Sequence, residues 1–164
     1  MLPADRRLRL TLHCDGAARG NPGPAGIGVQ ITDEHGEVVA QIGDGIGVAT
    51  NNVAEYTAAI RGLERARDLG ATEVLLRSDS RLLIEQLAGR WKVKNPTLQR
   101  LHREARSLSA GFERVAFEHV RRERNVEADR LANRGVDEWL AGEGASWERP
   151  PPSPRLWEAG EEPR

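Results

Sequence analysis

Apolar and polar positions alternate over the first third of the chain in the way expected of β-strands. Alternation over residues 8–14 predicts a first strand, and apolar stretches at 25–33 and 37–47 predict two more. The segment DEHG at 33–36 has the composition of a hairpin turn between the second and third. We therefore expect an antiparallel meander of three strands.

After residue 50 the spacing of apolar residues changes to that of a helix. Apolar positions three and four apart predict a helix from Asn52 to Leu69, and Gly70 is a typical helix stop. The remaining elements are expected in this order: a strand at 73–78, a helix from about 80 to 88, a helix that starts at Asn95–Pro96, a strand at 112–120 and a helix from about 126 to 141. This order predicts an α/β fold, with a five-stranded mixed sheet and helices on both faces.

Length and composition indicate one folded domain followed by an extension. A chain of 164 residues is long enough for one stable core, and we assign that domain to residues 1–142. The remainder contains GASWERPPPSPRLWEAGEEPR, which is rich in proline and acidic near its end. Residues 143–164 are therefore expected to be flexible, and they are a candidate site for a protein partner.

The cysteine and apolar content excludes disulfide-rich and membrane proteins. The single cysteine, Cys14, allows no disulfide framework, and its place in the first strand predicts a buried, inert thiol. No apolar run approaches the roughly 18 residues of a membrane span. Residues 1–7 also lack the apolar stretch of a signal peptide. We expect a soluble, monomeric protein of the cytoplasm with no membrane partner.

The net charge of −1 conceals an uneven distribution along the chain. Residues 77–134 carry 14 Lys or Arg against 8 Asp or Glu, whereas the flanking segments are acidic. A basic segment of this kind permits binding to nucleic acid. The alternative is that these cations are solvated on separate helix faces.

Four acidic residues occupy positions where an apolar run ends or a helix begins: Asp15, Glu55, Asp79 and Asp129. Aligned strands would bring them together at one end of a sheet. Hard divalent cations prefer oxygen ligands, and two ions about 4 Å apart clamp the attacking and leaving oxygens in phosphoryl transfer. The set predicts a carboxylate metal site in a phosphodiesterase.

Each acid also has an ordinary structural explanation when it is considered alone. These explanations are a turn at Asp15–Gly16, a capping box of Asn52 with Glu55, a helix cap at Asp79 or Ser80, and an acid that answers the helix dipole at Asp129. The functional interpretation depends on all four acids together.

Four blocks of sequence resemble, in order, the motifs of the type 1 ribonuclease H family, whose members cut RNA in RNA–DNA hybrids. The blocks are CDGAARGNPGPAG, TNNVAEYTAAI, LRSDSRLLIEQL and NVEADRLAN, within residues 8–140. The resemblance implies a five-stranded mixed sheet whose second strand is antiparallel to the others. It also implies an endoribonuclease that leaves 5′-phosphate and 3′-hydroxyl ends.

The resemblance implies a two-metal mechanism with two Mg²⁺ or Mn²⁺ ions. Asp15 is then the carboxylate shared by both ions, with Asp129 completing one site and Glu55 and Asp79 the other. One ion would lower the pKa of a bound water, and the other would neutralise charge on the departing 3′ oxygen.

Residues that contact the hybrid are implied in the same way. Gly20 would allow close approach to the RNA strand, Asn21 and Thr50 would hold a DNA phosphate, and Asn51 and Asn52 would reach minor-groove edges. The further candidates are Ser80, Arg81, Trp91, Lys92 and Lys94. Alternatives remain for three of the contacts: an ordinary turn at Gly20, a solvated helix arginine at Arg81 and a boundary core residue at Trp91.

Two features depart from many members of the family. A long basic insertion is missing between the two middle helices, where GRWKVKNPTLQ connects them directly. Trp91, Lys92 and Lys94 are the candidates to replace it, because they combine an aromatic surface with cations that bind phosphate.

The second departure is the missing histidine of the loop before the last acid, which here reads VRRERN. His119 lies too early to substitute, so Arg122 or Glu123 would assist, or the step would proceed unassisted.

Two other functional classes are compatible with the fold. One is a binding module for hybrid or duplex RNA that has lost its chemistry, and the other is a different nuclease of the wider superfamily. The four retained acids weigh against the first, and the TNN and GNPG blocks weigh against the second.

Overall fold

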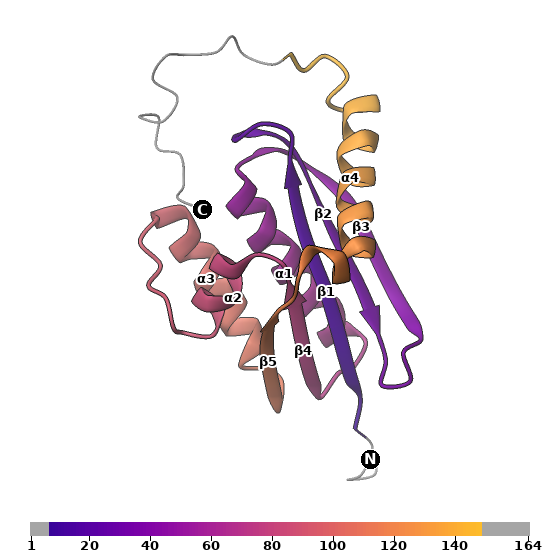
Figure 1. Ribbon diagram of the computed structural model, residues 1–164, viewed down its shortest axis with the longest axis vertical. Coiled ribbons are helices and arrows are strands. Elements are labelled where there is room, and N and C mark those ends of the chain that lie inside the picture. The colour runs from indigo at the N-terminus through magenta and orange to yellow at the C-terminus, as the bar shows by residue number, and fades with distance from the viewer. Residues whose placement is uncertain (1–6, 149–164) are drawn as a thin grey trace.

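The computed structural model describes residues 7–148, which form one five-stranded mixed sheet with helices on both faces (Figure 1). The strands are β1 (Arg9–Ala18), β2 (Gly23–Thr32), β3 (Val38–Ala49), β4 (Glu73–Ser78) and β5 (Arg114–His119). Their order in the sheet is β3-β2-β1-β4-β5. β2 is antiparallel to both of its neighbours, whereas β1, β4 and β5 run parallel. The predicted fold class is confirmed.

One strand boundary was predicted wrongly. β1 does not end near Asp15 but continues to Ala18, because small residues extend its ladder with β2. Asp15 pairs with Gly28, and Ala18 pairs with Ala25. Asp15 is therefore inside a strand, and the explanation of Asp15–Gly16 as an ordinary turn is wrong.

The helices are α1 (Asn51–Asp68), α2 (Arg81–Leu87), α3 (Pro96–Ser109), the 3₁₀ helix η1 (Arg122–Arg124) and α4 (Val126–Ala141). Three of them begin with a side-chain cap, in which Thr50, Ser80 and Asn95 accept hydrogen bonds from backbone N–H groups. The predicted Asn95–Pro96 helix start is confirmed. Ser80 rather than Asp79 caps α2, so the side chain of Asp79 is available for another role.

Apolar side chains fill the space between the sheet and α1, α2 and α3. Leu12, Cys14 and Val29 face this core, where Gly62 of α1 packs directly against them. Cys14 is completely buried, as predicted. Figure 1 shows α2 and α3 beside β5, while α4 lies beside β2 and β3 at the other edge.

A track of glycines brings α4 close to the opposite face of the sheet. Gly26 and Gly28 of β2 and Gly43 and Gly45 of β3 lie under α4, where an added Cβ would collide with helix atoms. At Gly28 that Cβ would lie 2.6 Å from the backbone nitrogen of Ala132. The glycines therefore fix how closely α4, which carries Asp129, approaches β1.

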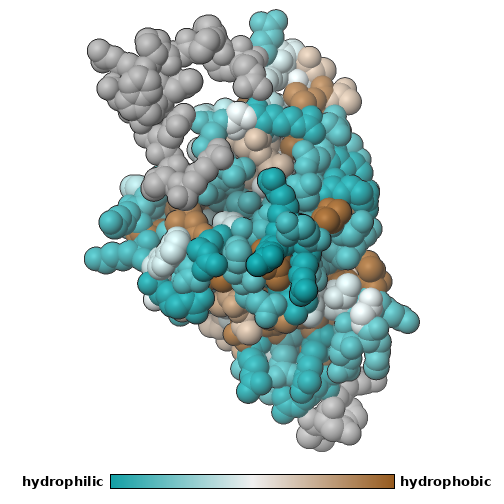
Figure 2. All heavy atoms as spheres, in the orientation of Figure 1, coloured by the Kyte–Doolittle hydropathy of each residue, from teal (hydrophilic) through white to brown (hydrophobic). Residues whose placement is uncertain are grey.

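The chain beyond α4 is described only as far as residue 148. Residues 142–146 form turns, and Gly144 packs against the ring of Trp139. Most of the extension predicted at 143–164 therefore lies outside the described residues. Among residues 7–148, no helix is long and apolar enough to cross a membrane. Hydrophilic residues cover most of the face in Figure 2.

Candidate metal and active site

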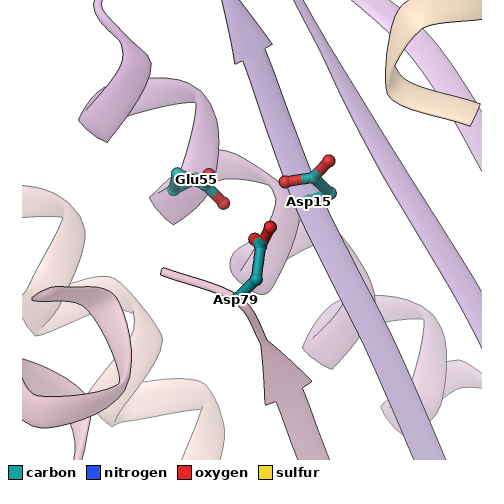
Figure 3. Close-up of side chains that lie close together, drawn as sticks. All are labelled: Asp15, Glu55 and Asp79. Atoms are coloured by element: carbon teal, nitrogen blue, oxygen red, sulfur yellow. The ribbon is translucent and has the colours of Figure 1, made fainter. Parts of the chain in front are cut away.

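Three of the four predicted acids converge at one end of the sheet. One ligand oxygen from each of Asp15, Glu55 and Asp79 can be chosen so that all three lie within 4.8 Å of one another (Figure 3). The parallel pairing of β1 with β4 accounts for two of them, because Cys14 pairs with Ser78 and each acid follows its paired residue. The three oxygens form a ligand set suited to a hard divalent cation.

Glu55 reaches this cluster because α1 packs directly on β1. The backbone N–H of Gly16 donates a hydrogen bond to Oε2 of Glu55 at 3.1 Å. A Cβ at Gly16 would lie 2.6 Å from the carbonyl oxygen of Ala54, so only glycine permits this approach. The capping-box explanation of Glu55 is wrong, since Thr50 caps α1 by accepting a hydrogen bond from the N–H of Val53.

Asp129 lies beside Asp15, outside the group of three. It belongs to the first turn of α4, and the side-chain amide of Asn133 lies 3.4 Å from its Oδ1. Asn125 fixes the start of this helix: its side chain is 1% exposed and donates a hydrogen bond to the carbonyl oxygen of Cys14 at 2.9 Å. Asp15 therefore lies close to all three of the other acids.

The electrostatics of the cluster favour a bound cation. Burial raises the pKa of Asp15, and the nearby charges of Glu55 and Asp79 raise it further. The pKa of Glu55 is also raised by burial and by Asp79, although the N–H of Gly16 opposes the shift. Without a cation the buried acids bind protons near neutral pH, and a divalent ion would replace those protons. The residues present therefore fit a metal site.

The raised pKa values predict that the metal-free protein loses stability as the pH rises. Above about pH 4 the unfolded chain releases protons that the buried acids still hold. The free energy of unfolding should therefore fall with pH, by at most about 1.4 kcal/mol per pH unit for each carboxyl. Urea denaturation in chelator between about pH 5 and pH 8 measures this slope.

Glu55→Gln should reduce that slope, and Mg²⁺ should flatten it. Glu104→Gln, on the exposed surface of α3, is the matched control and should leave the slope unchanged. A metal-free slope equal in the parent protein and in Glu55→Gln would contradict the argument.

Arg122 and Glu123, the two loop candidates, are placed differently. Nε of Arg122 lies 3.8 Å from Oδ2 of Asp79, although the Arg122 side chain is 85% exposed. Glu123, in η1, makes no hydrogen bond or ion pair within the described part of the chain. The side chain of His119 contacts the backbone of Asp79, with Nε2 3.2 Å from its carbonyl oxygen.

Several residues expected to contact the two strands of the hybrid are brought together at the start of α1. Oδ1 of Asn21 accepts a hydrogen bond from the backbone N–H of Asn51 at 2.9 Å, which joins the glycine-rich loop to the helix. Gly20 has a φ of 114°, a conformation that favours glycine. Asn52 is only 6% exposed. Asn51 and Asn52 lie about one helical turn before Glu55 in α1.

The other residues predicted to contact the substrate lie at the start of α2 or in the connection that follows it. Ser80 caps α2, and Arg81 lies 3.8 Å from the carboxylate of Glu85. Trp91, Lys92 and Lys94 lie in the connection between α2 and α3. Trp91 is 45% exposed, so its interpretation as a core residue is wrong.

Two residues that support the site, Asn125 and Gln86, were not predicted from the sequence. Asn125 directly precedes the helix predicted at 126–141, yet its side chain bonds to β1 instead of capping α4. Gln86 has a buried side chain that links α1 to the connection after α2. A polar residue on the apolar face of a predicted helix was the available signal for Gln86.

Comparison with known proteins gives one consistent result. A protein-family model described as reverse transcriptase-like matches residues 13–135, which include all four acids. A bifunctional protein of Mycobacterium tuberculosis is 49% identical over 131 residues, which are 79% of this chain and 36% of that protein. The ribonuclease HI of Halobacterium salinarum is 46% identical over 134 residues, which are 82% of this chain and 67% of that protein. The chain thus spans about a third of the length of its mycobacterial relatives.

Solved structures of related proteins have the same fold as this chain. The N-terminal RNase H domain of the Mycobacterium tuberculosis protein superposes with a TM-score of 0.77 at 48% identity, covering 79% of this chain and 99% of that one. RNase H1 of Halobacterium salinarum gives a TM-score of 0.78 at 46% identity, covering 79% and 98%. LC11-RNase H1, isolated from compost and solved in complex with an RNA/DNA hybrid, gives a TM-score of 0.77 at 43% identity, covering 80% of this chain and 99% of that one.

Proposed function

The chain belongs to the type 1 ribonuclease H family, and from this premise we propose that it is an endonuclease that hydrolyses the RNA strand of RNA–DNA hybrids. The observation that carries the proposal is the convergence of Asp15, Glu55 and Asp79, with Asp129 beside Asp15. Asp15, Glu55 and Asp79 come from three separate segments, and a structural role for each acid alone does not require them to meet.

The proposed site holds two divalent ions, Mg²⁺ or Mn²⁺. Asp15 would be the ligand common to both, Glu55 and Asp79 would complete one site, and Asp129 the other. When bound, such ions lower the pKa of a water and stabilise charge on the leaving oxygen. Water attack on phosphorus with cleavage of the P–O3′ bond leaves 5′-phosphate and 3′-hydroxyl ends.

The protein's own groups orient these ligands. The N–H of Gly16 fixes one oxygen of Glu55, and Asn125 holds the helix that carries Asp129. The guanidinium of Arg122 offers hydrogen-bond donors and no acceptor, so it is not suited to act as a base toward water. We assign it instead to neutralising phosphate charge beside Asp79, where a cation is favourable. Glu123 makes no hydrogen bond or ion pair with residues 7–148 that would support a role.

Recognition of the hybrid would fall to the glycine-rich loop and to the start of α1. The hydrogen bond from the N–H of Asn51 to Asn21 supports this, since it holds both segments in one arrangement beside Glu55. Thr50, Asn51 and Asn52 would then contact the DNA phosphate and the minor groove. The relative solved with an RNA/DNA hybrid has 43% identity to this chain, which supports the same class of substrate here.

One chain supplies all four acids, so we propose a monomeric enzyme. A cytoplasmic location remains a prediction. A partner for the C-terminal extension would bind mostly outside the described residues.

Cleavage of labelled substrates tests the proposal directly. The purified protein would be incubated with end-labelled RNA–DNA hybrid, RNA duplex and DNA duplex of the same sequence, each with Mg²⁺, Mn²⁺ or chelator. We expect metal-dependent internal cuts confined to the RNA strand of the hybrid. Tight hybrid binding without cuts under either metal would instead identify a binding module, and cuts in duplex DNA would identify another nuclease.

Asn52→Ala is expected to weaken the preference for hybrid over duplex DNA. An amide that reaches a base edge contributes about 1–3 kcal/mol of discrimination, so the ratio of the two affinities should fall about tenfold. Competition binding in chelator measures the ratio. Because Asn52 is buried, thermal unfolding of the variant must be measured alongside. An unchanged ratio in a folded variant would show that Asn52 does not read the substrate.

A further inference from the structure

Arg19 joins the glycine-rich loop to α4, the helix that carries Asp129. It lies between β1 and Gly20, and its backbone N–H donates a hydrogen bond to the carbonyl oxygen of Pro24 at 2.8 Å, which closes the loop at its base. Its side chain reaches α4, where Nη1 lies 2.7 Å from Oδ1 of Asp137. An ion pair as exposed as this one adds little stability, but it fixes the direction of the guanidinium.

The guanidinium also contacts Asn133, which lies one helical turn before Asp137. Nη2 of Arg19 lies 3.3 Å from the carbonyl oxygen of Asn133 and 3.5 Å from its Oδ1. Asn133 in turn donates from Nδ2 to the carbonyl oxygen of Asp129 at 3.0 Å, and the same nitrogen lies 3.4 Å from Oδ1 of Asp129. A guanidinium has only donors, so the amide oxygen of Asn133 faces Arg19 and the amide nitrogen faces Asp129. The contacts therefore have one direction, from Arg19 through Asn133 to Asp129.

Asn133 supports Asp129 in the way that Gly16 supports Glu55. The buried carboxylate of Glu55 accepts a hydrogen bond from the N–H of Gly16, and the half-buried carboxylate of Asp129 lies beside the amide of Asn133. Carboxylates that bind metals are commonly oriented by hydrogen bonds of this kind, and loss of such a partner lowers metal affinity or activity by about 10–100-fold. Arg19 and Asn133 are therefore placed to orient a metal ligand without touching the metal.

We propose that Arg19 and Asn133 are positioning residues, which hold the carboxylate of Asp129 ready for a divalent cation before the substrate binds. This inference rests on the proposed function, because it takes Asp15 and Asp129 as the ligands of one ion. It also means that the loop expected to approach the RNA strand and the helix that carries Asp129 are held as one unit.

Arg19→Gln and Asn133→Ala test the proposal, with Arg134→Gln as the matched control. Arg134 is also half exposed and also pairs with an acid of α4, Glu138, but it makes no hydrogen bond to Asn133 or Asp129 within residues 7–148. Binding of Mn²⁺ to the substrate-free protein would be followed by the electron paramagnetic resonance signal of the free ion. Asp129→Asn identifies the part of the binding curve that depends on this acid.

Arg19→Gln and Asn133→Ala should each weaken that part of the Mn²⁺ binding curve about tenfold, and Arg134→Gln should match the parent. In single-turnover cleavage of the hybrid, the Mn²⁺ concentration that gives half the maximal rate should rise by a similar factor in the first two variants. Saturating Mn²⁺ should restore most of the rate, because the ligand is misplaced and not removed. The double variant should resemble Asn133→Ala alone, since Arg19 acts through Asn133.

Mn²⁺ binding and a half-saturating concentration equal to those of the parent in both variants would overturn the proposal. Additive losses in the double variant would also overturn it, as would an Asp129→Asn variant that binds Mn²⁺ as the parent does. A merely structural role would lower the urea midpoint of unfolding and leave the half-saturating concentration unchanged. Failure of the proposed function would be visible separately, because the parent would then cut no hybrid, while Mn²⁺ binding to the substrate-free protein still reports on Asp129.

Discussion

Asp15→Asn is expected to abolish hydrolysis of the hybrid while hybrid binding is retained. The substitution keeps the shape of the side chain but removes one negative charge from the central ligand of the cluster. If Asp15 is common to both ions, several kcal/mol of transition-state stabilisation are lost, which corresponds to a rate lower by about a thousandfold or more. Single-turnover cleavage with Mg²⁺ and binding in chelator would be measured on the same preparation.

The same substitution should make the metal-free protein more stable near neutral pH. The pKa of Asp15 is raised by burial and by neighbouring acids, so near neutral pH the carboxyl must take up a proton when the chain folds, and asparagine removes that cost. A variant that is inactive yet unfolds at higher urea concentration in chelator would separate loss of chemistry from loss of fold. Substantial residual cleavage by Asp15→Asn would remove the argument that this cluster holds the metals.

Gly28→Ala is expected to have the largest effect on stability. The added Cβ would collide with backbone atoms of Ala128 and Ala132 in α4. Backbone atoms cannot relieve such a clash by changing rotamer, as a flexible side chain can. Overpacking of this kind should cost about 3 kcal/mol of unfolding free energy. Because α4 carries Asp129, a shift of about 1 Å should also lower the cleavage rate by about a hundredfold in molecules that remain folded.

Gly111→Ala is a suitable control, since its added Cβ would meet only the carbonyl oxygen of Leu108, at 3.3 Å. Thermal unfolding and cleavage would be measured for both variants. If Gly28→Ala were as stable and as active as Gly111→Ala, the glycine track would not set the position of Asp129.

The type and order of the elements were predictable where burial of one face imposes a regular spacing of apolar residues, as in β4. In that strand, Val74, Leu76 and Ser78 are buried, and the residues between them are partly exposed. The end of β1 was not predictable in this way. Gly16, Ala17 and Ala18 carry no apolar alternation, and they continue the strand only because β2 supplies backbone partners.

The site was predictable as a set of residue types rather than as a geometry. The acids were identified from their positions at the ends of apolar runs, but their meeting depends on the parallel register of β1 with β4. Asn125 and Gln86 escaped notice because their hydrogen bonds join segments that are distant in sequence or in different elements. Such bonds depend on the tertiary structure, which cannot be deduced from the spacing of apolar residues along the chain.

The chemistry of Cys14 makes the protein a convenient background for site-specific labelling. It is the only cysteine in the chain, and burial together with the nearby acids raises its pKa, so little reactive thiolate forms. Its contribution to the site is the backbone carbonyl that binds Asn125, not the sulfur. A cysteine introduced at an exposed position such as Arg103 would therefore be the sole thiol open to a maleimide fluorophore or spin label, without any change to β1.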